Sequence, residues 1–271
     1  MKRIKNFLIT GDTHNDAVTR LKNAKAAYPQ LDPTETAVII LGDAGFNYYL
    51  SKRDQKYKKH ASEFGYTIYC VRGNHEERPE NLNYGTVYDN NVEGIVYADP
   101  DYPLIRYLMD GGDYVINGKS CLVIGGAYSV DKWYRIEMAA YDNKHFCWFK
   151  DEQLTKEEKE KISKSVCGKH YDFVLTHTCP FSWQPTDLFL GFINQATVDN
   201  SMEIWMEELK DTFTWGVWCF GHYHADRIQK PCVEMFYTDI QSIEEITNRW
   251  NEYKAVGTLD WWLQTGESFD E

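Results

Sequence analysis

The chain has 271 residues, enough for one large domain or two small ones, and its 43% hydrophobic and 26% charged residues are ordinary for a globular protein. Its 29 basic and 41 acidic side chains give a net charge of −12, which disfavours nucleic acid and anionic membranes as general partners. No apolar run is long enough to cross a membrane, and the run behind the basic N-terminal residues is too short for a signal peptide. The seven cysteines form no C-x-x-C pair, so we expect reduced thiols and a cytoplasmic protein.

Short apolar segments, each ended by glycine or a polar residue, predict buried strands along much of the chain. The predicted strands cover residues 6–10, 37–41, 67–71, 121–124, 173–176 and 217–220. Segments between them predict helices over residues 16–27, 48–64, 155–166 and 202–209. This alternation of strands and helices indicates an α/β layered fold.

The remaining segments have other patterns. Residues 84–117 are rich in Tyr, Gly, Asp and Asn, with short alternating pieces, and predict meandering β-structure. Residues 233–237 predict another strand, and residues 240–254 predict a polar helix or a long ordered loop. Since no repeat, linker or charge block divides the chain, we expect a single domain over residues 1–271. Residues 225–271 are expected to pack on its core as a strand and a helical segment.

Side chains that can bind a metal ion directly follow five of the predicted strands. They are Asp12, His14, Asp43, Asn74, His75, His177, His222 and His224. A single loop histidine is usually a surface residue, but five of the eight histidines at equivalent strand ends are hard to explain by packing. Because the carboxyl ends of strands line the ligand crevice of open α/β sheets, we expect these side chains to converge. The Asp-x-His and His-x-His spacings place both members of each pair on the same side of an extended chain.

The donor types favour particular metals. Oxygen and imidazole ligands without a thiolate suit manganese, iron or zinc ions. Seven ligands are too many for one catalytic ion and suit two ions that share a bridging carboxylate. Two divalent cations would outweigh the charges of Asp12, Asp43 and a bridging hydroxide. Such a site attracts a phosphate ester, for which the ions supply a hydroxide nucleophile and neutralise charge.

Five sequence blocks together resemble the signature of the calcineurin-like metallophosphoesterases, in order and in approximate spacing, over residues 11–224. The blocks are Gly11-Asp12-Thr13-His14, Gly42-Asp43, Gly73-Asn74-His75-Glu76, His177 and Gly221-His222-Tyr223-His224. The resemblance implies a four-layer α/β/β/α sandwich with two central mixed sheets. It also implies two divalent or trivalent metal ions per chain, with manganese preferred and iron, zinc or nickel as alternatives.

The same resemblance implies a role for each residue of the blocks. The first ion would be bound by Asp12, His14, Asp43 and His224. The second would be bound by Asp43, Asn74, His177 and His222, so that Asp43 bridges the two. His75 would be the histidine that contacts the phosphate and protonates the leaving oxygen without binding metal; the alternative is a mere neighbour of Asn74.

These residues predict a phosphoesterase that hydrolyses a small phosphomonoester or phosphodiester through a hydroxide held by two metal ions. The alternative is a catalytically inactive metal-binding scaffold, or a partner-binding module, of the same fold. A nuclease needs a basic groove, which the net charge of −12 disfavours. A protein serine/threonine phosphatase is not expected, because residues 44–47 read Ala-Gly-Phe-Asn where that branch usually carries an Asp-Arg pair.

Substrate-binding candidates lie in the segment 125–135, which is predicted to be a loop that reaches the same crevice. They are Tyr128, Lys132 and Arg135, of which Arg135 can grip a phosphate with two parallel hydrogen bonds. A surface turn with local ion pairs is an equal alternative for this segment. Arg72, which flanks the block containing Asn74, is a further candidate.

Overall fold

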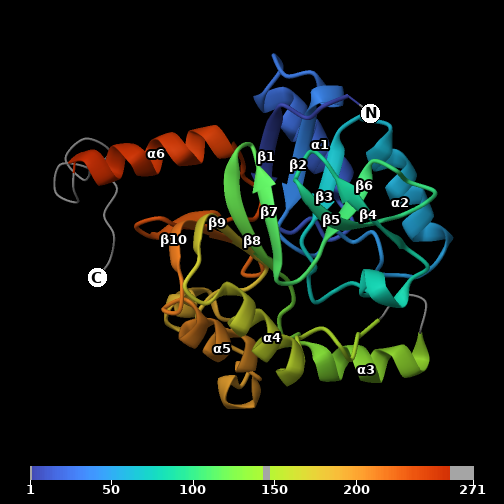
Figure 1. The fold of residues 1–271 in the computed structure, drawn as a ribbon. Coiled ribbons are helices and arrows are strands. Elements are labelled where there is room, and N and C mark those ends of the chain that lie inside the picture. Colours follow the sequence, from blue (N-terminus) through green and yellow to red (C-terminus); the bar gives the residue numbers. More distant parts are fainter. Residues whose placement is uncertain (1, 143–146, 257–271) are drawn as a thin grey trace.

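The computed structural model describes residues 2–142 and 147–256, which form two mixed β-sheets packed face to face, with helices on their outer faces (Figure 1). The seven-stranded sheet has the order β13-β1-β2-β3-β6-β5-β4, and the six-stranded sheet has the order β11-β12-β10-β9-β8-β7. The strands of the first sheet are β1 (Asn6–Thr10), β2 (Thr36–Ile40), β3 (Thr67–Cys70), β4 (Gly85–Asp89), β5 (Gly94–Ala98), β6 (Ile105–Leu108) and β13 (Ile240–Ser242). Those of the second are β7 (Gly112–Ile116), β8 (Lys119–Ile124), β9 (His170–Thr176), β10 (Thr214–Phe220), β11 (Arg227–Lys230) and β12 (Val233–Met235).

Six α-helices accompany these strands in the described part of the chain. They are α1 (Ala17–Ala27), α2 (Lys52–Ser62), α3 (Lys132–Tyr141), α4 (Lys156–Val166), α5 (Ser201–Leu209) and α6 (Ile243–Val256). None of them combines the length and the apolar character that a membrane-spanning helix needs.

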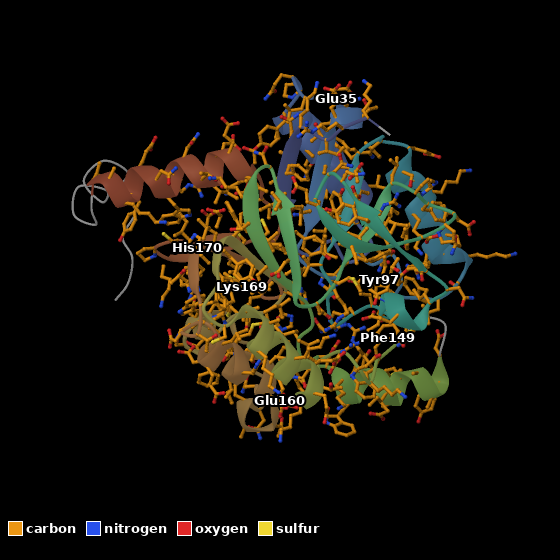
Figure 2. All side chains as sticks on the ribbon, viewed as in Figure 1. Glu35, Tyr97, Phe149, Glu160, Lys169 and His170 are labelled. Atoms are coloured by element: carbon orange, nitrogen blue, oxygen red, sulfur yellow. The ribbon has the colours of Figure 1, made fainter. Side chains whose placement is uncertain are left out.

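The alternation of side chains along the central strands creates the layers. In β1, Phe7 and Ile9 point into the core between the two sheets, whereas Leu8 points into a second core beneath α1 and α2. In β9, Phe173 likewise faces the other sheet, whereas Val174 packs in a third core that includes residues of α4 and α5. Both faces of these strands are therefore buried, as their continuous apolar runs require. The predicted four-layer α/β/β/α sandwich is confirmed; Figure 2 shows the side chains that occupy the spaces between the layers.

Parallel pairing aligns the strand ends that matter for the site. Strands β1, β2 and β3 are parallel neighbours in the first sheet, and β8, β9 and β10 are parallel neighbours in the second. The carboxyl ends of β3 and β8 connect the two sheets, because the backbone N–H of Gly126, after β8, donates to the carbonyl of Arg72, after β3. The loops after these strands consequently meet at one edge of the sandwich.

Three predicted segments differ from the structure. The helix expected over 48–64 begins only at Lys52, where the Ser51 hydroxyl caps it by accepting from the backbone N–H of Arg53. The segment 125–135 is not a loop throughout, because α3 begins at Lys132 and carries Arg135 in its first turn. Residues 240–254, expected as a polar helix or a long ordered loop, form the short strand β13 followed by the helix α6.

Helix α6 seals one end of the core between the sheets. Its residues Ile243, Ile246 and Trp250 belong to that core, and the Trp250 indole donates to the buried carboxylate of Glu234. Arg249 forms an ion pair with the same carboxylate at 2.9 Å. The last part of the C-terminal segment expected to pack on the core, residues 257–271, lies outside the described residues.

We predict that Trp250→Ala lowers the free energy of unfolding by about 3–5 kcal/mol, because it removes a large buried ring and leaves the Glu234 carboxylate without that donor. The control is Asn251→Ala, an exposed position on the same helix, which should change stability by less than about 0.5 kcal/mol. Urea unfolding followed by circular dichroism measures both. Equal midpoints for the two variants would show that α6 contributes nothing through Trp250.

Candidate metal centre

The loops after β1, β2, β3, β9 and β10 bring all eight predicted strand-end residues to one place. Six of them line a cavity of about 430 Å³: His14, Asp43, Asn74, His75, His222 and His224. The other two, Asp12 and His177, lie beneath it and are 1% and 0% exposed. By contrast His170, labelled in Figure 2, begins β9 and so lies at the opposite end of that strand from His177.

The first group of converging donor atoms consists of Asp12, His14 and His224. The Nε2 atoms of His14 and His224 are 2.7 Å apart. Asp12 Oδ2 lies 3.4 Å from His224 Nε2 and 3.8 Å from His14 Nε2. Asp43 Oδ2 is a further 3.8 Å from His14 Nε2, so four oxygen and nitrogen donors face one small space.

The second group is centred on His177. Its Nε2 atom lies 2.8 Å from Asn74 Oδ1 and 3.6 Å from Asp43 Oδ2. The rings of His177 and His222 are neighbours, with centroids 5.0 Å apart. Asp43 Oδ2 approaches a histidine of each group, and so does the Asp12 carboxylate, whose Oδ1 atom lies 3.6 Å from His177 Nδ1. Both carboxylates therefore lie between the two groups.

These donor sets fit two metal ions. Donors held at about 2.1 Å from one ion lie about 3 Å apart when they are neighbours in its coordination shell, which is close to the separations here. His177 Nδ1 faces the Leu41 carbonyl at 2.8 Å, so a neutral ring carries its proton there and leaves a lone pair on Nε2. That lone pair points at the amide oxygen of Asn74, another acceptor, and a cation between the two satisfies both.

The backbone reaches this arrangement through strained turns. Nine non-glycine residues of the described chain have positive φ, and five of them lie in these loops: His14, Asn15, Asp43, His222 and His224. Such conformations cost of order 1–3 kcal/mol each and persist where the surrounding structure enforces them. A Cβ atom at Gly42 would collide with the His177 ring, and one at Gly73 would collide with the Asp43 carboxylate. These positive-φ residues and glycines therefore allow the candidate metal ligands of different loops to approach one another closely.

Burial sets the protonation of the centre. It lowers the pKa of His222 to about 3 and that of His75 to about 4, so both rings are neutral at neutral pH, the form that can coordinate a metal. Burial alone would raise the pKa of Asp43, but the nearby imidazoles of His75, His177 and His14, with a hydrogen bond from the His75 backbone N–H, together hold that pKa below its usual range. Burial raises the pKa of Glu76 to about 8, so this carboxyl adds little negative charge beside Asp43.

A second layer of side chains holds the ligands in place. Asn74 Nδ2 donates to Ser129 Oγ at 2.8 Å, and Ser129 Oγ donates to Glu152 Oε2 at 2.6 Å, which turns the amide oxygen of Asn74 toward His177. Arg20, buried on α1, donates to the carbonyl of Asp12 at 3.3 Å. Sequence reasoning missed Ser129, Glu152 and Arg20, because they lie far from the sequence blocks or carry no pattern that marks them.

The four substrate-binding candidates have different places in the structure. Tyr128 and Arg135 line the cavity, and Arg135 also lines a smaller one of about 180 Å³ with His14 and His75. Arg72 does not line it, because its guanidinium bonds to Asp110 and to the carbonyls of Glu152 and Gly125.

Lys132 is likewise not among the residues that line the cavity. Its ammonium lies 4.3 Å from the centroid of the Trp148 ring. The structure thus brings two of the four candidates to the metal centre.

A further wall of the cavity comes from the segment between β9 and α5 and from the first turn of α5. Leu188, Phe189, Leu190, Ile193 and Val198 supply its apolar part. Gln184, Asn200 and Glu203 add polar atoms beside them. The cavity therefore has a metal-binding end and a largely apolar end.

Comparison of the sequence with models of known protein families identifies one match. The family model for calcineurin-like phosphoesterases matches residues 5–226, which include every residue of the metal centre. No curated protein sequence matches the chain at a significant level. Among solved structures, the chain is similar to a phosphopantetheinyl hydrolase from Mycobacterium tuberculosis, with 13% identity, a TM-score of 0.42 and coverage of 94% of each chain. That structural similarity is too low to inform the fold or the substrate.

We predict that Ser129→Ala weakens the binding of one of two manganese ions about 10–100-fold, because the Asn74 amide loses the hydroxyl that orients it. Isothermal titration of the metal-stripped protein with Mn²⁺ measures both affinities. The matched control is Ser165→Ala, an exposed position on α4, which should bind manganese like the unaltered protein. Identical titrations for the two variants would show that Ser129 does not position a ligand.

Proposed function

The chain belongs to the calcineurin-like phosphoesterase family, and we propose that it is a metal-dependent hydrolase of a small phosphomonoester or phosphodiester. The observation that carries this proposal is the convergence of histidine, carboxylate and amide donors around the buried carboxylates of Asp12 and Asp43, in the wall of a cavity of about 430 Å³. A cavity of this volume suits a small molecule better than a folded protein or a nucleic-acid duplex.

The residues that would hold the ions are those that the family resemblance implies. Asp12, His14 and His224 would bind one ion. Asn74, His177 and His222 would bind the other, with Asp43 serving both. Bound there, two cations supply a nucleophile derived from water at neutral pH and neutralise the phosphate charge. Oxygen and imidazole donors favour manganese, with iron, zinc or nickel as alternatives.

His75 is proposed as the catalytic residue that contacts the phosphate and protonates the leaving oxygen. Burial holds the pKa of its ring at about 4, so this role requires that the negative charge of a bound phosphate raise that pKa. Its ring lines the cavity next to Asn74 and belongs to neither group of converging donors. Its backbone N–H donates to Asp43 Oδ1 at 2.8 Å, which ties the ring's position to that of the shared ligand.

Arg135 and Tyr128 are proposed to contact the substrate. The Arg135 guanidinium bonds to Asp131 and to the Tyr48 hydroxyl, which fixes it at the cavity wall beside His75. A cation held in this way can bind a phosphate oxygen without a large loss of side-chain freedom. We also propose a cytoplasmic location, since all seven cysteines are free thiols, as in a reducing compartment.

We expect chelation to abolish hydrolysis of bis-p-nitrophenyl phosphate and of p-nitrophenyl phosphate, and added Mn²⁺ to restore it. The physical reason is that no side chain of the centre can generate a hydroxide at neutral pH unaided. Release of p-nitrophenolate, measured together with metal content by elemental analysis, provides the test. Full activity in metal-free protein would contradict the proposal. Two bound ions with no hydrolysis of any phosphate ester would favour the inactive scaffold.

We expect His75→Asn to lower kcat by about 10²–10⁴-fold for an alkyl phosphate while both metal ions stay bound. The loss should be smaller for p-nitrophenyl phosphate, because its leaving oxygen needs little protonation. His170→Asn, at the far end of β9, is the control and should leave kcat unchanged. Equal losses of kcat on both substrates would indicate that His75 stabilises the phosphate charge and does not donate a proton. Loss of a bound metal ion in His75→Asn would indicate that His75 is a metal ligand.

We expect Arg135→Ala to raise KM about 10–100-fold with little change in metal content, as removal of a hydrogen bond to a charged group does. Arg135→Lys should also be impaired, because an ammonium does not reproduce the planar fork. Lys132→Ala on the same helix is the control, since the Lys132 ammonium rests on the Trp148 ring and the residue does not line the cavity. Steady-state kinetics on one phosphate ester measures KM for each variant. An unchanged KM in Arg135→Ala would show that Arg135 does not bind the substrate.

A further inference from the structure

A buried carboxyl group lies in the cavity wall and has no part in the metal centre. Glu203, on α5, lines the cavity and is 3% exposed. Its Oε1 atom accepts a hydrogen bond from Thr178 Oγ1 at 2.7 Å. Its Oε2 atom has no hydrogen-bond partner in the structure.

The neighbours of Glu203 do not satisfy that oxygen. Lys159 is the cation that acts on it through space, but the Lys159 ammonium donates to Ser201 and forms no ion pair with Glu203 among the described residues. Two other polar side chains of the wall bond to each other, since Gln184 Nε2 donates to Asn200 Oδ1 at 3.1 Å. A buried acceptor without a partner is rare in folded proteins and needs a reason.

Glu203 is coupled in space to the metal centre. Thr178, which donates to it, directly follows the metal-ligand candidate His177. The Thr178 hydroxyl also lies 3.1 Å from the hydroxyl of Tyr223, the residue that follows His222. One cavity therefore has proposed metal ligands at one end, apolar side chains such as Leu188 and Ile193 along its wall, and in that wall the buried Glu203, one of whose oxygens has no partner.

We propose that the cavity accepts a phosphate ester whose alcohol has an apolar middle and ends in a hydrogen-bond donor, an ammonium or a hydroxyl group. This donor binds the carboxyl group of Glu203, which turns its unpaired oxygen toward the cavity. This inference rests on the proposed function, since it assigns the part of the substrate that carries no phosphate. An ammonium is the stronger partner, because it also compensates the buried carboxylate charge. Glu203 is thus a specificity-determining residue and takes no part in bond cleavage.

The test compares three families of phosphonates, which resemble the phosphate esters and are not hydrolysed. They carry a straight alkyl chain of three to eight carbons that ends in a methyl, a hydroxyl or an amino group. Binding to the Mn²⁺-loaded protein is measured by isothermal titration calorimetry. The proteins are the unaltered chain, Glu203→Gln and the control Glu208→Gln, which removes the same charge from an exposed position on α5.

At the best chain length, we expect the unaltered protein to bind the amino compound about 10–100-fold more tightly than the methyl compound, with the hydroxyl compound between them. That ratio should fall towards one in Glu203→Gln and stay high in Glu208→Gln. Equal binding of the amino and methyl compounds by the unaltered protein would overturn the inference, and this result does not depend on whether Glu203→Gln folds. If the unaltered protein still hydrolysed p-nitrophenyl phosphate, the proposed function would stand although the inference had failed. A preference that survives in Glu203→Gln would also overturn it, and binding of no phosphonate together with no hydrolysis would overturn both.

Discussion

Asp12 and Asp43 are each 1% exposed, and their carboxylates approach the same histidine rings at the edge where the two sheets meet. Two like charges buried together are costly unless cations or donors surround them. The backbone N–H groups of His222 and His75 donate to these carboxylates, and imidazoles enclose them. The strained loops and the close glycine contacts all serve to bring donors around this pair of charges.

The sheets supply the rigidity that this pair requires. The loops after three parallel strands of one sheet and two of the other carry the proposed metal ligands. Side chains packed between the sheets fix the distance between the ligands of one sheet and those of the other. Neighbouring groups then orient the proposed metal ligands, as Ser129 does for Asn74 and the Leu41 carbonyl does for His177. We therefore expect metal affinity to depend on these neighbours as well as on the proposed ligands themselves.

Sequence patterns predicted the strands well, because buried strands read as apolar runs. They also marked the residues that the structure brings together at the strand ends, because these residue types are unusual there. The blocks from Asp12 to His224 therefore led to the fold and to the family. The substrate end was harder to predict, because packing decides which side chains reach the cavity. Lys132 and Arg135 are three residues apart on one helix, yet only Arg135 lines the cavity. Nothing in the sequence near Glu203 marks it, since its importance comes from an oxygen that burial leaves without a partner.

Crystallography of the manganese-loaded protein, with anomalous scattering at the manganese edge, shows directly whether two cations share the Asp43 carboxylate. We expect two anomalous peaks per chain, one against Asp12, His14 and His224 and one against Asn74, His177 and His222, with Asp43 in contact with both. A single peak, or two peaks of which only one touches Asp43, would show that Asp43 does not bridge two ions.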